Sequence, residues 1–92
     1  MAEVQITERA IGSYRVEVSG VRSPTSHDVE VPPGLAEQIA VSGVPESDLV
    51  AASFEFLLER EPNTSILRSF SLAVIANYFP EWPEEMKRRF AR

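Results

Sequence analysis

Apolar and polar residues alternate with a period of two through the first third of the chain. Such alternation places one set of side chains on a buried face and the other in water, which is typical of half-buried antiparallel strands. The apolar positions of the three alternating runs are Val4 and Ile6; Tyr14, Val16 and Val18; and His27, Val29 and Val31. Turn-forming residues separate the runs at Gly12-Ser13 and at 22–25. The sequence therefore predicts a three-stranded antiparallel meander within residues 1–31.

Helical spacing replaces this alternation in the rest of the chain. Pro32 and Pro33 end the third strand, because proline has no N–H to donate to a strand ladder. A short helix is expected within 35–40 and a long amphipathic helix over 46–60, where a wide apolar face is repeated at helical spacing. Shorter helical segments are expected within 63–68, over 72–79 after a Ser71 N-cap, and from Pro83 onward.

These elements predict an α+β fold in a single domain, 1–92. The strands lie in 1–31 and the helices in 33–91, with one long and several short helices. A three-stranded sheet cannot leave its apolar face in water. We therefore expect the helix over 46–60 to cover that face and to form the centre of the core.

Composition excludes several classes of protein. The 92 residues include nine Lys and Arg against fourteen Asp and Glu, a formal net charge of −5. An acidic total argues against a protein that coats nucleic acid or an anionic membrane. The absence of cysteine removes disulfides, thiolate metal sites and thiol nucleophiles. The N-terminal residues contain no apolar secretory signal, so we expect a cytoplasmic protein without membrane attachment.

The side chains that carry catalytic chemistry are not arranged in a recognisable pattern. His27 is the one histidine, and a lone imidazole does not make a transition-metal site. Glu81, Glu84 and Glu85 cluster at the expected start of a helix, where acids are stabilising in any case. No phosphate-binding glycine motif and no nucleophile motif is present. We therefore expect no enzymatic activity and no cofactor.

Aromatic residues around Pro80 form one candidate binding surface. Tyr78 and Trp82 are of the types enriched at the energetic centres of protein interfaces. The other interpretation is that these rings and Phe79 close the small core. Of the group, Trp82 is expected to be partly exposed.

A basic run near the C-terminus forms a second candidate surface. It contains Lys87, Arg88 and Arg89 in the last turns of the final expected helix. Such a run can contact phosphate or an acidic partner. We therefore include these three residues with Tyr78 and Trp82 as candidate partner-binding residues.

The same basic run can instead be neutralised within the molecule. Glu84 stands four residues before Arg88 and Glu85 four before Arg89, and the acid comes first in each pair, which is the favourable order. Glu55 and Glu59 form a like-charge pair on the long helix that a nearby cation would relieve. The sequence leaves open whether the basic run faces these acids or a partner.

A helix-turn-helix over 71–90 is an alternative interpretation of the C-terminal segment. Against it, Pro80 and Glu81 occupy a turn where such motifs prefer glycine followed by an apolar residue. Glu84 and Glu85 would also lie at the start of the recognition helix, facing phosphates. Nucleic acid is therefore a disfavoured partner.

The segment 54–90 resembles a family of small bacterial proteins with no established function. The matching positions are 56–62, 65–67 and 78–82, which read FLLEREP, SIL and YFPEW. Ser71 stands where the family pattern has an aspartate N-cap, and both residues can cap a helix. The resemblance implies no activity, cofactor or catalytic residue.

The sequence therefore favours a non-enzymatic protein-interaction or regulatory module. Its expected partner is another protein, which includes a second copy of this chain, because a three-stranded sheet leaves two open edges. A weak DNA-binding regulator and an accessory subunit of an enzyme are the alternatives.

Overall fold

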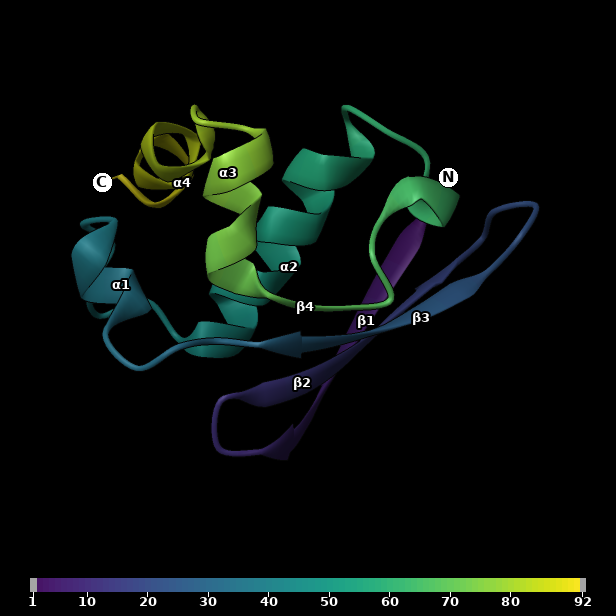
Figure 1. Ribbon diagram of the computed structural model, residues 1–92, viewed down its shortest axis with the longest axis horizontal. Coiled ribbons are helices and arrows are strands. Elements are labelled where there is room, and N and C mark those ends of the chain that lie inside the picture. Colours follow the sequence, from purple (N-terminus) through teal and green to yellow (C-terminus); the bar gives the residue numbers. More distant parts are fainter. Residues whose placement is uncertain (1, 92) are drawn as a thin grey trace.

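The computed structural model describes residues 2–91. Strands β1 (Glu3–Ala10), β2 (Ser13–Ser19) and β3 (Thr25–Glu30) form the antiparallel meander that the alternating pattern predicts. The inner face of β2 and β3 is fully buried, and its side chains include Val16, Val18 and Val29. The helices gather on one side of the sheet (Figure 1). The α+β class is therefore confirmed.

The sheet has a fourth strand that the sequence pattern does not predict. β4 (Ser69–Ser71) lies beside β3 and parallel to it, so the sheet is mixed and the prediction of three antiparallel strands is wrong in this respect. The helical turn expected within 63–68 is shortened to a 3₁₀ turn, Asn63–Ser65, after which the chain is extended. Three residues are too few to show a period of two, and their pairing depends on a strand about forty positions earlier in the chain.

The helical half follows the expected order, with shorter elements. The helices are α1 (Leu35–Gln38), α2 (Glu46–Leu58), α3 (Ile75–Tyr78) and α4 (Trp82–Phe90), and a 3₁₀ turn at Leu72–Val74 leads into α3. Ser71 occupies the N-cap position of that turn, but its hydroxyl makes no capping hydrogen bond. Pro80 ends α3 early, because proline pushes the preceding residue out of the helical region. In place of the single helix expected over 72–79, the structure has the 3₁₀ turn and then α3.

The core lies between α2 and its neighbours on both sides. Phe54 of α2 packs its ring against His27 on β3 and Phe70 on β4, with ring centroids 5.4 and 6.0 Å away. Trp82 and Met86 of α4 are also fully buried. α2 therefore covers the sheet, as expected, and also serves as the base on which the C-terminal helices pack (Figure 1).

Candidate functional site

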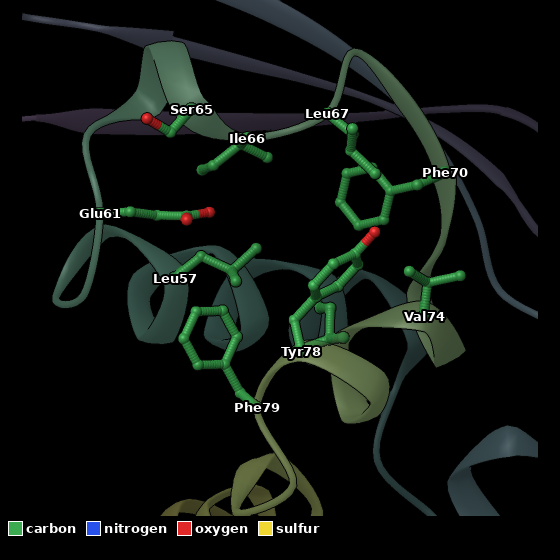
Figure 2. A pocket seen from close by; sticks show the side chains of 10 residues that line it. Leu57, Glu61, Ser65, Ile66, Leu67, Phe70, Val74, Tyr78 and Phe79 are labelled. Carbon is green, nitrogen blue, oxygen red and sulfur yellow. The ribbon is translucent and has the colours of Figure 1, made fainter.

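An apolar groove of about 310 Å³ opens at the C-terminal end of α2 (Figure 2). Its walls come from α2, the segment that follows α2, β4 and α3. The lining residues are Leu57, Glu61, Ser65, Ile66, Leu67, Phe70, Val74, Ile75, Tyr78 and Phe79. Segments that are separate in the sequence thus combine to form one concave, mainly apolar surface.

Exposed apolar side chains gather at this groove. Leu67 is 50% exposed and Tyr78 is 67% exposed, and both line it. Among the described residues, the other large apolar side chain in water is Ile11, which lies in the turn between β1 and β2. Apolar surface left in water beside a groove is a feature of binding sites rather than of ordinary protein surface.

Glu61 is the charged side chain of the groove lining. Figure 2 shows it reaching from the α2 side toward the middle of the groove. Its carboxylate makes no ion pair or side-chain hydrogen bond with any residue in the described range, 2–91. The groove therefore presents apolar surface and one free negative charge.

His27 holds one wall of the groove in place. Its Nδ1 lies 2.7 Å from the carbonyl oxygen of Leu67, and its Nε2 lies 2.8 Å from the Thr25 hydroxyl. A carbonyl can only accept, so Nδ1 donates, and in the neutral ring Nε2 accepts from Thr25. Asn63 adds donated bonds to Thr25 Oγ1 and to the Ser23 carbonyl, each 2.8 Å. The buried imidazole thus fixes the segment that carries Leu67.

The two aromatic candidates occupy different environments. Tyr78 lies on the rim of the groove and is exposed. Trp82 is wholly buried, and its Nε1–H donates to the Ser53 hydroxyl at 3.1 Å. The expectation that Trp82 is partly exposed is therefore wrong, because the indole finds its polar partner inside the α2–α4 contact.

The basic run is paired with acids of the same chain. Lys87 lies 2.8 Å from Glu84, and Arg88 lies 2.8 Å from Glu85. The Arg88 side chain is nevertheless 76% exposed, whereas that of Arg89 is 22% exposed.

Arg89 joins α4 to α2. One of its terminal nitrogens donates to both carboxylate oxygens of Glu59, at 2.9 and 3.0 Å. The Nε of Arg89 donates to Glu85 at 3.3 Å, and its other terminal nitrogen lies 3.8 Å from Glu55. The hydrogen bond from Arg89 lowers the pKa of the Glu59 carboxyl, and Arg60 lowers it further. The structure therefore pairs the basic run within the molecule, which was one of the two possibilities left open by the sequence.

Most of the groove residues were not singled out from the sequence. Leu67 belongs to a stretch expected to be helical, where an apolar residue is normally assigned to the core. Its exposure follows from the extended backbone that begins at Ile66, which local periodicity does not reveal. Tyr78 was singled out as a candidate from its residue type, with packing in the core as the competing interpretation, and its exposure is seen only in the structure.

The described residues contain no metal-binding cluster and no membrane-spanning helix. In the range 2–91, His, Cys, Asp and Glu form no cluster of three or more that could hold a metal ion. None of the helices in that range has the length and apolar character needed to cross a membrane. No protein-family model, curated protein or solved structure matches the chain. The resemblance carried by 54–90 accordingly stays a prediction.

Proposed function

We propose that this protein is a non-enzymatic interaction module that binds another protein through the groove between α2, β4 and α3. The observation that carries the proposal is the meeting of exposed Leu67 and Tyr78 at a concave apolar surface. Tyrosine supplies a large contact area with few rotatable bonds, and it is enriched among residues that dominate binding energy. The groove is thus the part of the surface best suited to bind an apolar side chain of a partner.

Two further features support this choice of surface. The three segments that carry the family resemblance contribute most of the groove lining, including Leu57, Ile66 and Tyr78. The competing surface, the basic run, already uses its charges on acids of α2 and α4. Partner binding through the basic run would require those ion pairs to be exchanged, whereas the groove is open.

The test uses peptides displayed on phage from a random ten-residue library, selected against the immobilised full-length protein. Selected peptides are then made synthetically, labelled with a fluorophore and titrated by anisotropy. Leu67→Ser and Tyr78→Ser are expected to weaken binding by about tenfold each, which is the loss typical of a central interface residue.

Ile11→Ser is the matched control, because it removes an exposed apolar side chain outside the groove. It is expected to leave binding unchanged, and circular dichroism confirms that all three variants are folded. Peptides that bind all three variants as well as the wild type would show that the groove is not the docking surface.

A further inference from the structure

β4 is an edge strand, and its open edge borders the groove. The sheet order is β1-β2-β3-β4, so β4 has a neighbour on one side. Figure 2 shows the segment from Leu67 to Val74 forming one side of the groove, opposite Leu57 and Glu61. The apolar surface and the unpaired strand edge therefore belong to one continuous site.

The register of the ladder identifies the backbone groups on that edge. Asp28 of β3 is paired with Ser69, and its N–H donates to the carbonyl of Arg68 at 2.7 Å. In a parallel ladder the residues on either side of the paired one bond to the neighbouring strand. Arg68 and Phe70 thus face β3, which leaves the N–H and C=O of Ser69 directed to the open edge. An additional strand would find a donor and an acceptor there.

The other edge of the sheet is less suited to an added strand. β1 contains a bulge at Arg9, between the pairs made by Glu8 and Ala10. Charged side chains also lie along it, at Glu3, Glu8 and Arg9. Bulges and charges are devices by which proteins protect edge strands from pairing. β4 has neither, because its three residues are Ser, Phe and Ser.

Glu61 defines the charge of a complementary ligand. It is the one charged residue of the groove lining and has no cationic partner within residues 2–91. The chain as a whole is acidic, with a net charge of −5. A basic side chain on the ligand would pair with Glu61 and would also be attracted by the overall charge.

We propose that the groove binds an extended segment of a partner protein, which adds beside β4 as a fifth strand, places one apolar side chain in the groove and presents a Lys or Arg to Glu61. This inference rests on the proposed function and specifies its ligand. Backbone hydrogen bonds to the open edge would supply binding energy, and the groove and Glu61 would supply specificity, as in other cases of strand addition.

The backbone part of the proposal is tested by N-methylation of the groove-dependent peptides selected above. Each amide is methylated in turn, and the dissociation constant is measured by anisotropy. Methylation of the amide that donates to the Ser69 carbonyl is expected to weaken binding by about tenfold or more, and methylation of the amides on either side of it is expected to have little effect, because alternate amides of a strand face its neighbour. A scan in which neighbouring amides are equally sensitive, or in which no amide is sensitive, would show that the ligand does not pair with this edge, and would overturn the inference while leaving the groove as the docking site.

The charge part is tested with Glu61→Gln. It is expected to weaken binding of the same peptides by about fivefold. Added salt should weaken binding to the wild type and so reduce the difference between the two proteins. Glu17→Gln is the matched control, since Glu17 is exposed on β2 away from the groove. Equal binding by wild type and Glu61→Gln, or selected peptides without a basic residue, would overturn this part.

Two other outcomes separate the inference from the proposed function. Selected peptides that bind Leu67→Ser and Tyr78→Ser as tightly as the wild type would show that the groove is not the docking site. The proposed function and the added strand would then both be wrong. Light scattering of the free protein tests whether the groove instead binds a second copy of this chain. A dimer that dissociates in Leu67→Ser would show that the groove takes a second copy of this chain instead of a basic segment of another protein.

Discussion

Single polar side chains in the core connect the helical layer. Ser53 is fully buried on α2, where its hydroxyl donates to the Leu49 carbonyl at 2.7 Å and accepts from Trp82 at 3.1 Å. One hydroxyl can do both because it has one proton and two lone pairs. The bond from Trp82 to Ser53 gives the buried indole N–H the acceptor that it would otherwise find in water.

We expect Ser53→Ala to lower the free energy of unfolding by about 1–3 kcal/mol, because it leaves the Trp82 N–H buried without an acceptor. Urea denaturation monitored by tryptophan fluorescence measures the change. Ser47→Ala is the control, since Ser47 is exposed near the start of the same helix. Equal stability of the two variants would contradict the role assigned to Ser53.

Tyr14 makes a second contact of this kind, between β2 and the start of α2. Its hydroxyl donates to Glu46 at 2.9 Å, and burial, together with the neighbouring carboxylate, raises the pKa of Tyr14 to about 12. The ordinary value is 10.0, so the folded state holds this proton more tightly than the unfolded state does. The contribution of Tyr14 to stability is therefore complete below pH 10 and declines as the pH rises from 10 to 12.

We expect the difference in the free energy of unfolding between wild type and Tyr14→Phe to change across this pH window. The wild type should become less stable relative to the variant as the pH rises. Denaturation at a series of pH values measures it, and subtraction of the variant removes the titration of other groups. A difference that does not vary with pH would show that the Tyr14 hydroxyl titrates normally.

At the scale of elements, α2 and α4 are joined by ion pairs as well as by packing. Arg89 of α4 donates to both oxygens of Glu59, and Arg60, which lies over the Phe56 ring, is 3.5 Å from Glu81 at the start of α4. Because the pKa of Glu59 is lowered in the folded state, its contribution to stability is present above the ordinary carboxyl range and is lost as the pH falls through the lowered value.

We expect Arg89→Gln to raise the pKa of the Glu59 carboxyl toward its ordinary value. NMR titration of the carboxyl carbons measures this directly. Arg88→Gln is the matched control, because Arg88 pairs with Glu85 and makes no contact with Glu59. The same shift in both variants would mean that general charge, rather than the Arg89 bond, sets the pKa.

His27 ties the backbone just before β4 to β3. The imidazole anchors the carbonyl of Leu67 immediately before β4 begins, and its ring packs on Phe54. We expect His27→Leu to keep the apolar contact with Phe54 and to lose the hydrogen bond to the Leu67 carbonyl. The Phe70 amide should then exchange its hydrogen faster. Ser26→Ala, an exposed neighbour on β3, should leave the exchange rate unchanged. Equal protection in wild type and His27→Leu would show that β4 is held by its own ladder alone.

The elements also show how far local sequence determines this fold. The alternation of Tyr14, Val16 and Val18 predicted β2 with its correct inner face, since a strand of seven residues repeats its pattern several times. β4 was missed because Ser69–Ser71 contains a single apolar residue. The groove was missed with it, because its wall depends on that short strand. Trp82 was expected to be partly exposed and is buried, whereas Tyr78, for which the sequence left binding and core packing open, is exposed.

At the scale of the whole molecule, the distribution of charge favours a protein partner over nucleic acid. The net charge is −5, and the basic residues of α4 are paired with Glu84, Glu85 and Glu59. The first helix of the alternative helix-turn-helix is reduced to four residues, Ile75–Tyr78, after a 3₁₀ turn. Binding to DNA would have to overcome both the total charge and the internal ion pairs.

We therefore expect no change in the anisotropy of a labelled generic DNA duplex when the protein is added at low salt. A homeodomain of similar size serves as the positive control for the assay. Binding that weakens with salt and disappears in Lys87→Glu and Arg88→Glu would contradict this expectation and restore the DNA-binding alternative.

The sequence by itself determined the features that depend on neighbouring residues. Alternation set the three strands of the meander, prolines set where strands and helices end, and composition set the acidic charge and the absence of thiol chemistry. Only the tertiary structure decided the pairing of β4, the burial of Trp82, the Arg89–Glu59 contact and the groove. The first three of those features join residues 29 to 41 positions apart, as in Trp82 with Ser53 and Ser69 with Asp28. Such contacts arise when complete elements pack, so no local pattern of apolar and polar residues encodes them.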